Sequence, residues 1–153
     1  MKRELLVVLG VLFSFIACSN PLLINRNMTG NWQAYSLTQN SSDVNAFPIG
    51  GTTTSYFSLI DNGSNIQMTS FYINGSSYIT WTYCSGIYSD NNFTGNVNGY
   101  YYNTSNQIVN VTLSFAVTVN SEKTMGNGTF TETLSCNGNS ASASGTTTIS
   151  KID

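Results

Sequence analysis

The sequence predicts an all-β protein, built as an antiparallel up-and-down barrel of about eight or nine strands, with a β-sandwich as the alternative. Three observations predict this fold class. Apolar and polar residues alternate in many short segments, Asn-Gly pairs separate several of these segments, and residues 28–153 show no helical periodicity of useful length. Hairpins that follow one another along the chain favour the barrel over a Greek-key sandwich.

The first half of this domain contains short alternating segments that predict strands. They span residues 32–37, 53–60, 66–73 and 78–84. Asp61-Asn62-Gly63 ends the second segment and Asn74-Gly75 ends the third. Asn and Gly tolerate the positive φ angles of tight hairpin turns, so both sites predict a reversal of the chain.

The second half of the domain shows the same pattern more strongly. Its predicted strands span residues 93–97, 100–102, 109–119, 125–136 and 141–150. Asn98-Gly99 and Asn137-Gly138 are the predicted turns. From Val109 to Val119 every odd position is apolar, so these side chains are expected on the core face of one strand.

The carboxyl group of Glu132 falls inside a predicted strand. It shares a face with Phe130 and Leu134, so it either points into the barrel or reaches water at the barrel mouth. Of these two positions, the mouth is the one that we expect.

The start of the chain has the features of an export signal. Lys2 and Arg3 precede an uncharged run, residues 5–17, that is too short to span a bilayer as a helix. The run ends in Ala17-Cys18, which resembles the lipobox of bacterial lipoproteins. This resemblance implies a signal peptide at 1–17, lipidation of Cys18, a lipidated tether at 18–27 and a β-barrel domain at 28–153. Ser19 follows the cysteine, which by the lipoprotein sorting rule implies the outer membrane of a bacterial envelope.

Two further cysteines lie in the barrel domain. Cys84 and Cys136 form an even pair in a chain that is expected to be exported, where disulfide bonds persist. A disulfide bond between them is therefore expected, and two buried free thiols are the alternative.

The composition argues against several classes of function. The chain contains no histidine and only 8% charged residues, which leaves no Ser-His-Asp triad and no common zinc site. The scarcity of basic residues argues against nucleic acid as a partner. Asp61-Asn62-Gly63 lacks the alternating carboxylates of a calcium loop and is better explained as a turn. We therefore expect a non-enzyme without a metal or cofactor.

Gly30-Asn31-Trp32 opens the domain with a Gly-x-Trp motif, and Gly145–Lys151 closes it with a strand of Gly-Thr type. Both features resemble lipocalins and the related calycins, in which the tryptophan closes the base of an up-and-down barrel. The resemblance implies that Lys151 packs on Trp32, as a late basic residue does in lipocalins. A purely structural role for Trp32 is the alternative.

Two kinds of function remain. The first is an envelope-anchored lipoprotein with a non-catalytic structural or interaction domain, whose partner is an envelope or surface protein that contacts the tyrosines Tyr100, Tyr101 and Tyr102. The second is lipocalin-like binding of a small apolar ligand inside the barrel. The candidate ligand or core residues are Trp32, Phe57, Trp81, Leu113, Phe115 and Glu132. In both cases we expect the lipidated Cys18 to anchor the protein to the membrane.

Overall fold

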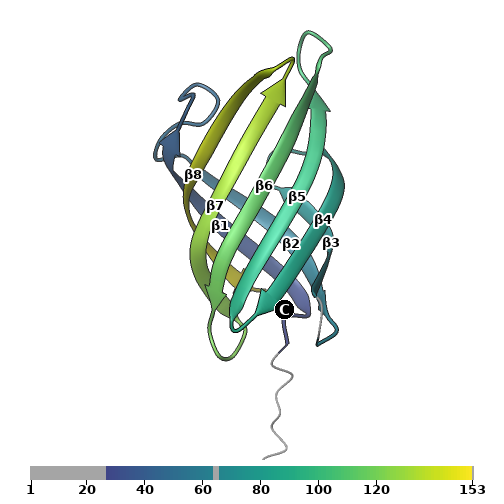
Figure 1. The fold of residues 1–153 in the computed structure, drawn as a ribbon, viewed down its shortest axis with the longest axis vertical. Coiled ribbons are helices and arrows are strands. Elements are labelled where there is room, and N and C mark those ends of the chain that lie inside the picture. The colour runs from purple at the N-terminus through teal and green to yellow at the C-terminus, as the bar shows by residue number, and fades with distance from the viewer. Residues whose placement is uncertain (1–26, 64–65, 153) are drawn as a thin grey trace, which may run out of the picture.

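The chain folds into a closed eight-stranded β-barrel (Figure 1). The computed structural model describes residues 27–63 and 66–152. The strands are β1 (Gly30–Ser41), β2 (Thr52–Asp61), β3 (Ile66–Ile73), β4 (Thr80–Ser89), β5 (Asn92–Tyr102), β6 (Ile108–Val119), β7 (Met125–Cys136) and β8 (Asn139–Lys151). Each strand pairs antiparallel with the next, and β8 pairs with β1 to close the barrel. The predicted up-and-down barrel is confirmed. Within the described residues, no helix is long and apolar enough to cross a membrane.

The two ends of the barrel differ. We call the end where β1 begins and β8 finishes the closed end, which lies at the bottom of Figure 1. The opposite end, the open end, carries the loops 42–51, 74–79, 103–107 and 137–138. At the closed end the backbone N–H of Met28 donates to the Asp61 carboxylate over 2.9 Å, and the indole N–H of Trp32 donates to the Met28 carbonyl over 2.9 Å. These bonds hold the chain start across the base of the barrel.

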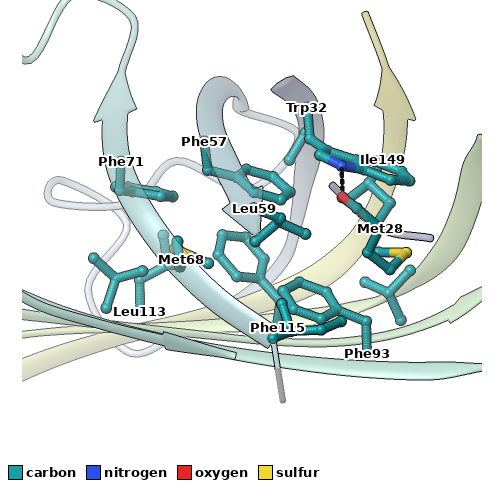
Figure 2. Packing of buried hydrophobic residues seen from close by; sticks show 14 of the residues in the cluster. Met28, Trp32, Phe57, Leu59, Met68, Phe71, Phe93, Leu113, Phe115 and Ile149 are labelled. Atoms are coloured by element: carbon teal, nitrogen blue, oxygen red, sulfur yellow. Dashed lines mark hydrogen bonds between the residues drawn. The ribbon is translucent and has the colours of Figure 1, made fainter. Parts of the chain in front are cut away.

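Aromatic rings fill the closed half of the interior. Phe57 stacks at centroid distances of 6.2–6.4 Å on Trp32, Phe93 and Phe115. Figure 2 shows these rings among the other buried side chains of the core. The six odd positions from Val109 to Val119 are all at most 7% exposed, as their alternation predicts. Lys151 is the cross-strand partner of Trp32, but the cation–π contact found in the described part of the chain joins Lys123 and Tyr88.

One predicted turn is wrong. Asn98-Gly99 lies within β5, which runs without interruption from Asn92 to Tyr102 and pairs with β6 along its whole length. The reversal before β5 occurs at Asp90-Asn91 instead, where both residues have positive φ angles of 51° and 65°. Gly99 has a different role, because a Cβ at this position would come within 2.8 Å of the Trp81 ring. The segment predicted at 78–84 is a strand, but it begins at Thr80 and continues to Ser89, so Tyr78 and Ile79 lie in the preceding loop. The other predicted strands and the turn at Asn137-Gly138 are confirmed.

The predicted disulfide bond is also wrong: Cys84 and Cys136 are free thiols. Cys84 lies on β4 and pairs in register with Val97, whereas Cys136 lies at the far end of β7 beside Asn139. Two whole strands separate them, each about 4.8 Å from the next. A disulfide bond needs Cα atoms within about 7 Å, so the barrel wall keeps the pair apart.

The wall is loosest between β3 and β4. Among the described residues, backbone pairing between these two strands is found at Ile66 and Gly86, near the closed end. Further towards the open end, the rings of Phe71 and Trp81 meet edge to face at 4.8 Å. Side-chain packing therefore joins these two strands where backbone pairing does not.

Candidate functional site at the open end of the barrel

The closed half of the barrel leaves no room for a ligand. Trp32, Phe57, Leu113 and Phe115 are at most 4% exposed and belong to the packed core, and Trp81 packs against it. The free space beside Leu113 and Phe115 is about 10 Å³, at the lower limit for a single water molecule. Five of the six candidate ligand residues are therefore core residues.

A polar layer lies above this core. Ser36 and Thr147 are at most 6% exposed, and the Ser36 hydroxyl donates to the Thr147 hydroxyl over 3.0 Å. Thr147 in turn donates to the Tyr35 carbonyl over 3.3 Å, so each hydroxyl has a partner. Ser55 is 3% exposed and lines the same small space beneath Glu132. A layer of polar side chains thus interrupts the apolar interior halfway along its axis.

Above the polar layer the open end contains a cavity of about 190 Å³, which we call the mouth cavity. Its wall includes Phe47, Tyr78, Ile79, Tyr101, Glu132 and Leu134. This volume is below the usual range for drug-sized ligands, so the mouth cavity suits a molecule of a few heavy atoms.

Glu132 provides the ionisable carboxyl group of the mouth cavity. Strand parity places it inward on β7, between Leu113 on β6 and Ala143 on β8. It is only partly exposed, and it lines the mouth cavity, the small space below it and a polar hollow of about 470 Å³ near Ser142. It thus lies inside the mouth rather than in open water. Burial raises the pKa of Glu132 from its ordinary 4.5 to about 7. Within the described residues no cation offsets this burial.

The loop between β1 and β2 forms one side of the mouth. The Asp43 carboxylate accepts the backbone N–H of Asn45 over 2.9 Å, and the Asp43 carbonyl accepts that of Phe47 over 2.8 Å. This turn brings the Phe47 ring over the opening, where the side chain is only 9% exposed. The sequence analysis did not identify Phe47, since a lone aromatic residue in a loop has no periodicity that marks it as buried.

The side chains of Tyr100, Tyr101 and Tyr102 alternate between the two faces of β5, as strand geometry requires. Tyr101 pairs in register with the buried Val109 and lines the mouth cavity. The contact of these tyrosines with a partner protein stays a prediction. The ring of Tyr101 meets that of Tyr78 edge to face at 5.2 Å. Burial raises the pKa of Tyr101, and the nearby Tyr78, Cys136 and Glu132 raise it further. Tyr100 and Tyr102 alternate with Tyr101 on β5, and their rings contact each other at 6.0 Å.

A second feature lies on the outer face of the barrel. Tyr56 on β2 and Tyr72 on β3 are cross-strand partners whose rings stack at 5.4 Å with an interplanar angle of 16°. Beside them is a shallow hollow of about 220 Å³ that Ser58 and Ser70 also line. We call this pair with Tyr35, which is 52% exposed on the neighbouring strand, the tyrosine face. The outward positions of β7 and β8 carry mainly serine, threonine and asparagine.

Comparison with known proteins gives no family: neither a protein-family model nor a curated protein sequence matches this chain. In the part of the chain that the structure describes, no three His, Cys, Asp or Glu side chains lie together as metal ligands would. One carboxylate oxygen of Asp61 accepts the backbone N–H of Gly63, as in a turn, and the other accepts that of Met28.

Proposed function

We propose that this protein is an envelope-anchored lipoprotein whose barrel is a non-catalytic interaction domain. The proposed anchor is Cys18, behind a signal peptide at 1–17, and the proposed location is the outer membrane of a bacterium. These residues lie outside the described part of the structure, so the anchor rests on the lipobox resemblance alone. The proposed partner is an envelope or surface protein.

The tyrosine face is the observation that carries the interaction role. Tyr35 and Tyr72 are about half exposed although the interior of the barrel accommodates other aromatic rings. Tyrosine provides rigid apolar area and a hydroxyl group, a combination that is common at protein interfaces. A filled barrel with aromatic side chains outside fits an interaction domain better than a carrier. The alternative from sequence, an apolar ligand inside the barrel, has less support, because Phe57, Leu113 and Phe115 occupy that space.

The anchor is tested with a Cys18→Ser variant in the source organism. The unchanged protein should carry acyl chains by mass spectrometry and fractionate with membranes, because two or more chains give stable anchoring. The variant should lack the acyl mass. An unchanged protein that carries no acyl group would refute the anchor.

The interaction role is tested by placing a photoreactive amino acid at Tyr72 in living cells. The matched control is the same amino acid at Thr129, which is exposed on the outer face of β7. We expect a discrete cross-linked protein from position 72 and none from position 129. Equal cross-linking from both positions, or none from either, would contradict an interaction through the tyrosine face.

A further inference from the structure

The mouth cavity combines one acidic group with aromatic and aliphatic walls. Phe47, Tyr78 and Tyr101 supply the rings, and Ile79 and Leu134 supply aliphatic surface. Glu132 is at the inner end of this space, because it also lines the small space above the core. A molecule that enters through the mouth cavity therefore passes the rings before it reaches the carboxyl group.

Among residues 27–63 and 66–152, no positive charge compensates the carboxyl group of Glu132. The small space below Glu132 is also lined by uncharged residues from four strands: Ser36 on β1, Thr53 and Ser55 on β2, Ile73 on β3 and Leu113 on β6. The other titratable groups that line the mouth cavity are Tyr101 on β5 and Tyr78 before β4, and neither of these becomes a cation. A partly buried carboxylate without a cation is unfavourable, and a bound cation would remove that cost.

The surrounding rings favour the same kind of ligand. Aromatic faces attract cations through their quadrupole, and this attraction grows where water is partly excluded. An anion would be repelled by Glu132, and one carboxylate is too few ligands for a divalent metal ion. The small volume and the aliphatic walls leave room for a short apolar chain beside the charged group.

We propose that the mouth cavity is a binding site for a small organic cation of the alkylammonium type, with its ammonium group at Glu132 and its alkyl chain against Phe47, Ile79 and Leu134. This site is independent of the lipid anchor and of the tyrosine face, and it differs from an apolar ligand held in the core.

The site predicts a specific dependence on pH. Since the pKa of Glu132 is about 7, the carboxylate form increases from pH 5.5 to pH 8 while an alkylammonium stays protonated, as a lysine side chain does. Apparent affinity scales with the fraction of the competent form, so it should rise about thirtyfold over this interval.

Three six-carbon probes test the proposal by NMR titration of the purified protein: hexylammonium, hexanol and hexanoate. At pH 8 we expect hexylammonium to bind at least tenfold more tightly than the other two, with shifts at residues around the mouth cavity. Lowering the pH to 5.5 should remove most of this preference. Binding of hexanol or hexanoate as tightly as hexylammonium would overturn the proposal, and so would the absence of binding at millimolar concentrations.

Glu132→Gln supplies the decisive comparison, because glutamine keeps the shape of the side chain and removes its charge. We expect this variant to lose the preference for hexylammonium and the dependence on pH. The matched control is Glu122→Gln, an exposed glutamate in the turn between β6 and β7, which should bind like the unchanged protein. Unchanged binding in Glu132→Gln would refute the site, and the probe and pH comparisons in the unchanged protein decide the matter even if this variant fails to fold.

Discussion

Glu132 should make the protein less stable as the pH rises from 5 to 8, and Glu132→Gln should remove this dependence. The pKa of Glu132 is about 7 in the folded protein against an ordinary 4.5, so the folded state binds more protons than the unfolded chain between these values. The free energy of unfolding therefore falls across this interval and is constant above it. At about 1.4 kcal/mol per tenfold change in proton affinity, the full loss is about 3 kcal/mol. Solvent at the mouth screens the charge, which makes this value an upper bound.

Urea denaturation followed by tryptophan fluorescence measures this effect at pH 5, 6, 7 and 8. The difference between the unchanged protein and Glu132→Gln cancels the contributions of the other carboxyl groups. We expect the variant to gain about 1–3 kcal/mol relative to the unchanged protein between pH 5 and pH 8. Glu122→Gln removes a charge of the same sign in an exposed loop and should gain much less. Parallel stability curves for the unchanged protein and Glu132→Gln would refute the burial of this carboxyl group.

Three further predictions concern the scaffold. Gly128→Ala should destabilise the barrel by at least about 3 kcal/mol in urea denaturation, since its Cβ would clash with the backbone carbonyl oxygen of Ala116 on β6; a cost below about 1 kcal/mol would contradict the close approach of β6 and β7. Trp32→Phe should cost about 2–4 kcal/mol, because it leaves the buried Met28 carbonyl without its donor and creates a void; unchanged stability would mean that the base of the barrel is not closed by this bond. Cys84 and Cys136 should both react with a thiol reagent in the protein unfolded without a reducing agent, and Cys84 should react more slowly in the folded than in the unfolded protein, because burial raises its pKa. If neither cysteine reacts until the protein is reduced, the two are joined by a disulfide bond.

Local pattern predicted the strands well, because a strand's periodicity depends on which side faces the core. The six apolar positions from Val109 to Val119 are buried as their alternation indicates. The same local reasoning misread Gly99, since a glycine that makes room for the Trp81 ring looks like a turn glycine in sequence. Asp90-Asn91 forms the real turn, and the prediction missed it because it relied on Asn-Gly pairs, although Asp and Asn also tolerate positive φ angles.

The depth of a residue along the barrel axis could not be predicted from the sequence. Parity indicated that Glu132 faces inward, but it does not tell how far a residue lies from the barrel mouth. The pairing of Cys84 with Cys136 failed because it was inferred from the even number of cysteines, although the predicted up-and-down order already places other strands between them. Phe47 and Tyr78 come from loops, and their meeting at the mouth cavity depends on how the barrel closes.

Burial of the ionised Glu132 carboxylate lowers the stability of the folded protein, and this free-energy cost bears on the function of the residue. Above pH 7 its ionised form opposes folding, whereas glutamine would occupy the same volume without a charge. Ser36, Ser55 and Thr147 show that this part of the interior accommodates neutral polar side chains with their hydrogen bonds satisfied or in contact with free space. Stability therefore does not account for a carboxyl group at this position. A bound cation would, since it is the partner that the described residues do not supply, and the gain in stability on adding hexylammonium at pH 8 should then match the affinity measured by titration.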